Sequence, residues 1–333
     1  MSRTLAIAGG GSWGSALSIA LAPRFERIRL WVYEPDLARR MQSGRENDVY
    51  LPGFAIPDHV LVTHDLEEAA TGADIILGVM PSQHARGVYE RMLPYVGRST
   101  CFVSATKGIE NGTLLRMTEV IAEVVGRKFS PRVAVLSGPT FAREIARGDP
   151  AAVVISSTDA ELAADIQCAF SGPSLRLYTN ADPVGVELGA ALKNVIAIGA
   201  GVCLGLNLGS NTLAALITRG LAEISRLAIA LGGKPRTLAG LAGLGDLVLT
   251  CTGELSRNRS FGIELAKGRK TSEIVSSMTM VAEGVSTTRA AVDLARREKV
   301  EMPITEQMYA VMELGKDPRT AIRELMERSL KPE

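Results

Sequence analysis

Residues 5–22 read LAIAGGGSWGSALSIALA. A short apolar run, a glycine-rich turn and a stretch of small and apolar residues follow one another, which predicts a strand, a turn and a helix. The glycines at 9, 11 and 14 satisfy G-x-G-x-x-G: the first permits the turn, the second lets the backbone approach a pyrophosphate, and the third lets the helix pack on the strand. We therefore predict that a dinucleotide binds at the helix N-terminus, against Gly9, Gly11, Ser12, Trp13 and Gly14.

A carboxylate follows at the spacing that this motif requires. Glu34 lies 20 residues beyond Gly14, at the end of the second predicted strand, where a carboxylate can accept hydrogen bonds from an adenosine ribose. We predict that Glu34 and the preceding Tyr33 complete the cofactor pocket. Glu34 should repel a 2′-phosphate, and the nearest basic residues, Arg39 and Arg40, could reach the pocket only if the next helix begins close to the strand end.

The charge balance limits the class of partner. The chain has 333 residues, with 37 Lys+Arg against 36 Asp+Glu, so its net charge is +1. No global field is available to hold a nucleic acid or an anionic membrane, and any phosphate site must be local. We expect a small-molecule substrate and no nucleic acid.

Cysteine usage and hydropathy predict a soluble, cytoplasmic protein without a metal. The four cysteines lie at least 35 residues apart, and the three histidines form no i, i+4 pair, so we expect neither a disulfide framework nor a metal site. The longest weakly polar run, 195–206, is too short to span a bilayer. Residues 3–22 superficially resemble a secretory signal, but their glycines interrupt the continuous apolar helix that a signal needs.

The pattern changes from alternating strands and helices to helices alone near residue 182. The apolar runs before it predict strands at 5–8, 28–32, 75–79, 101–104, 133–136, 152–156 and 175–178. The runs after it predict helices over 186–200, 212–231, 256–267 and 286–297. We expect an α/β fold in which residues 1–181 form a dinucleotide-binding domain with a doubly wound, mostly parallel sheet, and residues 182–333 form a mostly α-helical substrate-binding domain. The cleft between the domains is the expected ligand site.

Seven later segments resemble one family when they are taken together. In order and spacing, from about residue 4 to residue 315, the chain resembles bacterial NAD(P)-dependent glycerol-3-phosphate dehydrogenase. The resemblance implies interconversion of sn-glycerol 3-phosphate and dihydroxyacetone phosphate, with NAD or NADP as cofactor and glycerophospholipid synthesis as the consumer. Homodimer formation stays open. The segments are Pro81-Ser82, Ala105-Thr106-Lys107-Gly108, Ser137-Gly138-Pro139-Thr140-Phe141-Ala142, Leu192-Lys193-Asn194, Gly243-Leu244-Gly245-Asp246, Ser256-Arg257-Asn258-Arg259 and Val281-Ala282-Glu283-Gly284.

Two lysines are candidates for the chemistry. Lys193 lies on a predicted helix whose neighbouring positions on the same face are small or apolar, so desolvation should lower the pKa of its amine and make it a base for the C2 hydroxyl. A lysine that snorkels at a helix edge would give the same pattern. The resemblance assigns Lys193 to proton transfer and to substrate binding. Lys107 follows a predicted strand, where it could orient substrate oxygens and further depress the pKa of Lys193; the resemblance gives it to substrate and cofactor.

The remaining candidates surround a predicted phosphate site. Ser256, Arg257 and Asn258 open a predicted helix and combine a guanidinium, two polar side chains and helix-end amides, although a solvated helix cap would look similar. Pro139 is expected in the first turn of another helix, beside free amides. The resemblance gives Gly138, Thr140, Asp246, Ser256, Arg257 and Asn258 to the substrate, and Ala142, Arg257, Val281 and Glu283 to the cofactor.

Two other functions fit part of this pattern. A related two-domain dehydrogenase of a hydroxy acid or sugar acid would need a carboxylate clamp in place of residues 256–259. A noncatalytic nucleotide sensor would have no need of a proton acceptor at Lys193.

Overall fold

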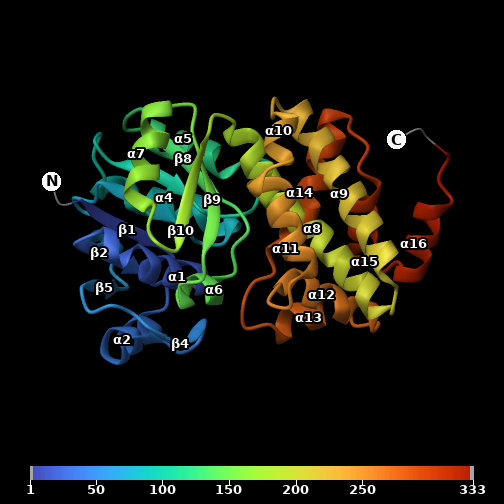
Figure 1. The fold of residues 1–333 in the computed structure, drawn as a ribbon, viewed down its shortest axis with the longest axis horizontal. Helices are drawn as coiled ribbons and strands as arrows, with labels where there is room; N and C mark the ends of the chain where they lie inside the picture. The colour runs from blue at the N-terminus through green and yellow to red at the C-terminus, as the bar shows by residue number, and fades with distance from the viewer. Residues whose placement is uncertain (1–2, 331–333) are drawn as a thin grey trace.

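One mixed sheet organises the first half of the chain. In the computed structural model, which describes residues 3–330, eight strands form it in the order β10-β9-β8-β7-β6-β1-β2-β5, and all neighbours run parallel except β8 and β9 (Figure 1). Their bounds are β1 Thr4–Ala8, β2 Arg27–Trp31, β5 Val60–Thr63, β6 Ile75–Gly78, β7 Cys101–Ser104, β8 Arg132–Ser137, β9 Ala151–Ser156 and β10 Leu175–Asn180. The predicted α/β class and mostly parallel sheet are confirmed.

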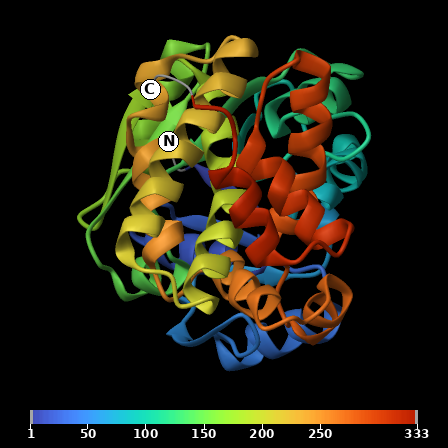
Figure 2. The same ribbon diagram turned by 90° about the vertical axis from the view of Figure 1, so that its right-hand side faces the viewer.

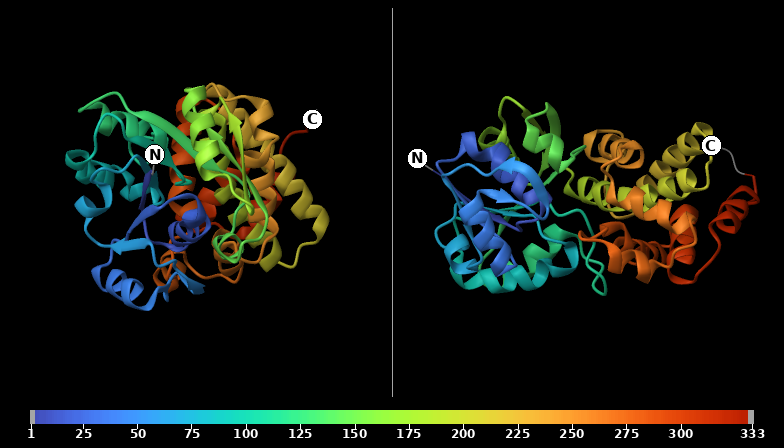
Figure 3. Two further views of the ribbon diagram at one scale, coloured as in Figure 1. Left: turned by 60° about the vertical axis from the view of Figure 1, so that its left-hand side comes forward. Right: turned by 90° about the horizontal axis from the view of Figure 1, so that it is seen from below.

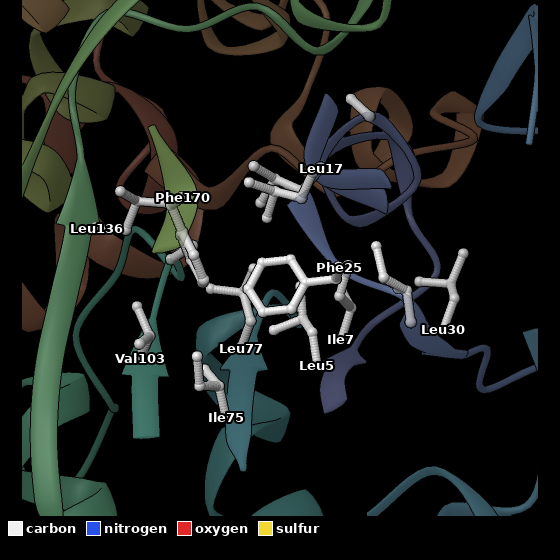
Figure 4. Close-up of a cluster of buried hydrophobic side chains, with 14 of the residues drawn as sticks. Leu5, Ile7, Leu17, Phe25, Leu30, Ile75, Leu77, Val103, Leu136 and Phe170 are labelled. Atoms are coloured by element: carbon white, nitrogen blue, oxygen red, sulfur yellow. The ribbon is translucent and has the colours of Figure 1, made fainter. Parts of the chain in front are cut away.

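Helices cover both faces of the sheet. Alternate residues of each strand point to opposite faces, and apolar residues on both faces must be buried. Leu5 and Ile7 belong to one core cluster with Leu17 and Phe170, as Figure 4 shows, whereas Ala6 belongs to the cluster on the other face. The helices are α1 Ser12–Leu21, α2 Pro35–Gly44, α3 Leu66–Ala70, α4 Ala85–Met92, α5 Met117–Gly126, α6 Ala142–Arg147 and α7 Ala160–Phe170, with 3-10 turns η1 Ala22–Arg24, η2 Ser82–His84 and η3 Leu93–Tyr95.

All seven predicted strands are present, and their ends differ by at most two residues. Three short strands were not predicted. β5 is a four-residue edge strand, and β3 Glu46–Asn47 pairs with β4 Leu51–Ala55 in a separate hairpin that contains Pro52 and Gly53. Short strands with turn residues carry little hydrophobic periodicity, so a sequence pattern does not reveal them.

The second half is helical and surrounds α8 Pro183–Gly205. The other elements are α9 Ser210–Ala230, α10 Pro235–Leu238, the π-turn η4 Leu241–Gly245, α11 Asp246–Thr252, α12 Arg257–Ala266, α13 Thr271–Ser277, α14 Glu283–Glu298, α15 Pro303–Glu313 and α16 Pro318–Met326. Figure 2 turns these helices toward the viewer, and the right-hand view in Figure 3 shows them beside the sheet. The ends of the two predicted domains, residues 1–2 and 331–333, lie outside the described residues.

Helix α8 is the core of this half. It is long and apolar enough to cross a membrane by length and composition, but 89% of its most apolar window is buried inside the protein. The Asp182 carboxylate caps its N-terminus by accepting a hydrogen bond from the Gly185 amide at 2.9 Å. Its apolar side chains therefore serve the interior packing of the helical half, and Lys193 is one of the few charged groups on it.

Candidate active site

The glycine-rich turn has the geometry that its motif predicts. Gly9 has a φ of +130°, and a Cβ there would lie 2.7 Å from the Val79 carbonyl oxygen. A Cβ on Gly14 would overlap the Gly9 carbonyl oxygen, so α1 packs directly on the turn. A Cβ on Gly11 would meet no atom of the described residues within 4 Å, so this side of the turn is open to a ligand. The turn is thus closed on the protein side and accessible on the other.

The N-terminus of α1 fits an anion. Helix α1 begins at Ser12, no side chain of residues 3–330 caps it, and its first turn contains no acidic residue. The positive end of its dipole and its first amides can therefore hold a pyrophosphate. The Trp13 indole Nε1 in this turn is buried and has no hydrogen-bond partner among the described residues. Trp13 and Ala142 both pack against the core cluster on the α1 face of the sheet.

Glu34 is held by a tyrosine that the sequence did not single out. It lies directly before α2, three residues after β2 ends, and its Oε1 accepts a hydrogen bond from Tyr50 Oη at 2.9 Å. The Tyr50 amide donates to Asn47 Oδ1 at 2.9 Å, and Asn47 Nδ2 donates at 2.8 Å to both the Gly10 carbonyl and Ser15 Oγ. The hairpin therefore ties the glycine-rich turn to the Glu34 carboxylate. Burial, reinforced by Glu34, raises the pKa of Tyr50 and keeps it a neutral donor.

The two arginines considered for this pocket are already paired. Helix α2 begins at Pro35, close to the strand end, but Arg39 pairs with Asp36 and Arg40 makes two hydrogen bonds, of 2.9 and 3.2 Å, to Asp48. Tyr33 is 70% exposed.

A buried carboxylate joins the two candidate lysines. Asp246, the first residue of α11, is fully buried, and its Oδ2 lies 2.7 Å from Lys107 Nζ while its Oδ1 lies 2.9 Å from Lys193 Nζ. Lys193 Nζ also donates to Thr250 Oγ1 at 2.6 Å, and Thr250 Oγ1 donates to the Asp246 carbonyl at 2.6 Å. Three segments far apart in the sequence thus meet at one carboxylate: the loop after β7, the middle of α8 and the start of α11.

This environment prepares Lys193 for proton exchange. Desolvation lowers the pKa of its amine to about 8, Asp246 opposes the shift, and the Lys107 charge adds to it. The side chain is therefore not a snorkelling lysine: it is buried, and its proton can leave and return near neutral pH.

Lys107 brings the loop after β8 to the same place. Its Nζ donates to the Gly138 carbonyl at 3.0 Å and to Thr140 Oγ1 at 3.4 Å. Gly138 has a φ of +151°, and a Cβ there would lie 2.9 Å from the Val153 Cα. The expectation for Pro139 was wrong: α6 begins at Ala142, so the proline lies in a loop, because residues 138–140 turn toward Lys107 before the helix starts.

A series of hydrogen bonds through two asparagine side chains connects the lysines to α12 and α14. Asn194 Nδ2 donates to the Lys107 carbonyl at 3.4 Å, Asn258 Nδ2 donates to Asn194 Oδ1 at 3.0 Å, and the Gly284 amide donates to Asn258 Oδ1 at 2.9 Å. Ser256 Oγ caps α12 by accepting from the Arg259 amide at 3.2 Å. Residues 256–258 therefore lie at the start of a helix, as predicted. Asn258 in its first turn contacts Asn194, the residue that follows Lys193.

The predicted late cofactor residues gather at the start of α14. Arg257 is exposed, and its Nη1 donates to the Val281 carbonyl at 3.0 Å. Glu283, the first residue of α14, accepts hydrogen bonds from the Ser82 amide at 3.2 Å and from Ser82 Oγ at 2.8 Å. Burial raises the pKa of Glu283. Residues of the two halves of the chain thus meet at Glu283.

Comparisons with known proteins cover nearly the whole chain. Residues 4–163 match the family model for the N-terminus of NAD-dependent glycerol-3-phosphate dehydrogenase, and residues 182–323 match the model for its C-terminus. The chain belongs to the NAD-dependent glycerol-3-phosphate dehydrogenase family. A relative from Koribacter versatilis, named glycerol-3-phosphate dehydrogenase (NAD(P)+), is 57% identical over 330 residues, which is 98% of each chain. A relative of the same name from Syntrophotalea carbinolica is 50% identical over 329 residues, 99% of each chain.

A solved structure agrees with this assignment. The crystal structure of glycerol-3-phosphate dehydrogenase from Coxiella burnetii superimposes with a TM-score of 0.94, at 41% identity, and covers 98% of this chain and 99% of that one. Membership of the glycerol-3-phosphate dehydrogenase family confirms the predicted resemblance, the enzyme class and the NAD(P) cofactor. It decides against the two alternatives, a hydroxy-acid dehydrogenase and a noncatalytic sensor.

Three side chains join the site of this glycerol-3-phosphate dehydrogenase family member without having been predicted as site residues. Thr250 contacts Lys193, Asn194 lies between Lys107 and Asn258, and Tyr50 contacts Glu34. Asn194 follows Lys193 directly in the segment Leu192-Lys193-Asn194, so its position in the sequence could have indicated that it belongs to the site. Thr250 and Tyr50 lie on short elements, α11 and the hairpin, that the sequence pattern did not predict.

Proposed function

We propose that this chain interconverts sn-glycerol 3-phosphate and dihydroxyacetone phosphate with NAD or NADP, and that Lys193 transfers the proton. The observation that carries the assignment of roles is the buried Asp246 carboxylate, which pairs with both Lys107 and Lys193 in a glycerol-3-phosphate dehydrogenase family member. Residues 1–181 would bind the dinucleotide, and residues 182–333 would supply most of the substrate contacts.

The bound cofactor supplies a nicotinamide ring that takes or gives the hydride at C2. Gly9, Gly11, Ser12, Trp13 and Gly14 would hold its pyrophosphate, because the turn is open on the Gly11 side and the α1 amides are uncapped. Tyr33 and Glu34 would contact the adenosine ribose. Ala142, Val281 and Glu283, with Lys107 and Arg257, would complete the cofactor contacts.

Proton transfer follows from the state of Lys193. In oxidation, the neutral amine accepts the C2 hydroxyl proton as the hydride leaves; in reduction, the ammonium returns it to the carbonyl oxygen. Asp246 orients the amine, and the Lys107 ammonium lowers its pKa and attracts the developing negative charge on the substrate oxygen. Gly138 and Thr140 lie at Lys107 and would bind the same part of the substrate.

The phosphate would bind where α12 begins. Ser256, Arg257 and Asn258 combine a cation, polar groups and the positive end of a ten-residue helix. The net charge of the chain is only +1, so a phosphate must be held by local groups, and this arrangement supplies them.

The function is tested by following nicotinamide absorbance with dihydroxyacetone phosphate and each reduced cofactor. We expect turnover with both NADH and NADPH. The 2-oxo acids pyruvate and ketopantoate, which are the oxidised forms of hydroxy-acid substrates, serve as controls and should give no turnover. Turnover of a 2-oxo acid but not of dihydroxyacetone phosphate would contradict the proposal.

Cofactor choice depends on Glu34. Replacing Glu34 with alanine should shift the NADP:NAD ratio of kcat/KM toward NADP by about tenfold, or roughly 1.4 kcal/mol of relieved repulsion. Tyr50→Phe is the matched control, because it frees the Glu34 carboxylate without removing its charge. We expect a smaller change in that variant. An unchanged ratio in Glu34→Ala would mean that Glu34 does not face the ribose.

We propose further that the enzyme works in the cytoplasm and supplies glycerol 3-phosphate for glycerophospholipid synthesis. The near-zero net charge and the buried position of α8 support a protein without nucleic-acid or integral membrane contact. Homodimer formation stays a prediction that light scattering of the purified chain would decide.

A further inference from the structure

Helix α8 comes very close to the backbone of the turn before Asp246 at Gly189. Gly189 lies one helical turn before Lys193. A Cβ on Gly189 would lie 2.8 Å from the Ala242 carbonyl oxygen, 3.2 Å from Leu238 Cδ1 and 3.3 Å from the Gly243 Cα. Two of these three neighbours are backbone atoms of η4, which cannot rotate away as a flexible side chain can. An added methyl group would therefore displace the turn itself.

The turn that Gly189 touches is a π-turn that leads directly into Asp246. The Gly245 amide donates to the Gly240 carbonyl at 3.1 Å, five residues earlier, and α11 begins with the next residue. On its other side the turn is pressed against α10, because a Cβ on Gly243 would overlap the Leu238 carbonyl oxygen. The turn is thus confined between α8 and α10, and any displacement must pass along the backbone to the start of α11.

We propose that Gly189 is a positioning residue: by letting the π-turn rest directly on α8, it sets the separation of Asp246 Oδ1 from Lys193 Nζ. The inference rests on the proposed role of Lys193 in proton transfer. The separation is 2.9 Å in this structure, and both side chains are buried, so a shift of a few tenths of an ångström changes an ion pair that water does not screen.

The direction of the effect follows from the charged groups that face Lys193. These are Asp246 and the Cys251 thiol from α11, and Lys107 from the loop after β7. Burial raises the pKa of Cys251 to about 12, so this thiol stays neutral below that pH. Asp246 stabilises the ammonium of Lys193, whereas Lys107 destabilises it. Moving Asp246 away therefore lowers the pKa of Lys193, and the pH at which oxidation reaches half its maximal rate falls.

The test compares two alanine substitutions on the same buried helix. Gly189→Ala should lower kcat by about tenfold, because the base loses its orientation, and should move the midpoint of the oxidation pH profile down by about half a unit. Gly199→Ala is the matched control: its Cβ would meet Leu216 and Met308 side-chain atoms at 3.5 Å, which is ordinary contact. This variant should keep the wild-type kcat and midpoint. The cofactor Kd should be unchanged in both.

A double variant separates positioning from general damage. In an Asp246→Asn background, Gly189→Ala should move the midpoint no further, because the charge through which it acts is absent. If Gly189→Ala does not fold, Ala242→Gly loosens the same turn without adding an atom and should lower the midpoint by a smaller amount. A wild-type midpoint in the folded variants, or an equal shift in the Asp246→Asn background, would overturn the inference. Wild-type turnover of dihydroxyacetone phosphate is measured first, so that a failure of the proposed function is recognised separately.

Discussion

Replacing Lys193 with alanine lowers kcat by at least about 10²-fold, the usual scale for the loss of a general acid or base, and leaves the cofactor Kd unchanged. The amine lies 2.9 Å from Asp246, and its pKa of about 8 lets it gain and lose a proton near neutral pH. Asp246 keeps its ion pair with Lys107 in the variant, so the buried carboxylate is not left without a cation. Steady-state kinetics and cofactor titration of the purified variant measure both quantities.

Lys193→Arg is the matched control for charge. Arginine can pair with Asp246 but cannot be deprotonated in a protein, so it keeps the positive charge and abolishes the base. We expect it to be as inactive as the alanine variant. Recovery of activity in Lys193→Arg would assign Lys193 to charge stabilisation alone, and near-normal turnover in Lys193→Ala would remove it from the mechanism.

The parts of the fold that the sequence predicted are those with a strong local pattern. The glycine-rich turn requires small residues at fixed spacing, and the buried strands are runs of apolar residues, so both could be recognised one segment at a time. The long helices of the second half were predicted for the same reason. Even so, the ends of α8 were placed short, because Pro183 and Gly205 lie at its limits where the apolar periodicity is weakest.

The geometry of the site depends on contacts between segments, which no local pattern contains. The resemblance identified Lys107, Lys193 and Asp246 as site residues, but the shared carboxylate is visible only once β7, α8 and α11 are packed together. Tyr50 was missed because it lies between the two short strands of the hairpin. Thr250 was missed because the seven-residue helix α11 was not predicted, so nothing placed Thr250 one helical turn after Asp246 and on the same face.

Removal of the Arg257 guanidinium should have the second large effect on turnover. We expect Arg257→Ala to cost about 2 to 5 kcal/mol in kcat/KM for dihydroxyacetone phosphate, which is roughly 30-fold to several thousand-fold. The reason is local: with a chain of net charge +1, the phosphate depends on the groups at the start of α12. Ser256 and Asn258 beside it are neutral, so neither can replace the lost cation.

Unphosphorylated substrates decide whether Arg257 acts on the phosphate. The loss caused by Arg257→Ala should shrink sharply with dihydroxyacetone or glyceraldehyde, because these have no phosphate to lose its partner. Arg257→Lys should fall between wild type and alanine for dihydroxyacetone phosphate, since an ammonium keeps the charge but not the paired donors of a guanidinium. The Arg257 hydrogen bond to the Val281 carbonyl supplies the competing explanation, in which the variant loosens the loop before α14 and weakens cofactor binding. That explanation predicts an equal loss with phosphorylated and unphosphorylated substrates and a raised cofactor Kd, and this combination would contradict the assignment of Arg257 to the phosphate.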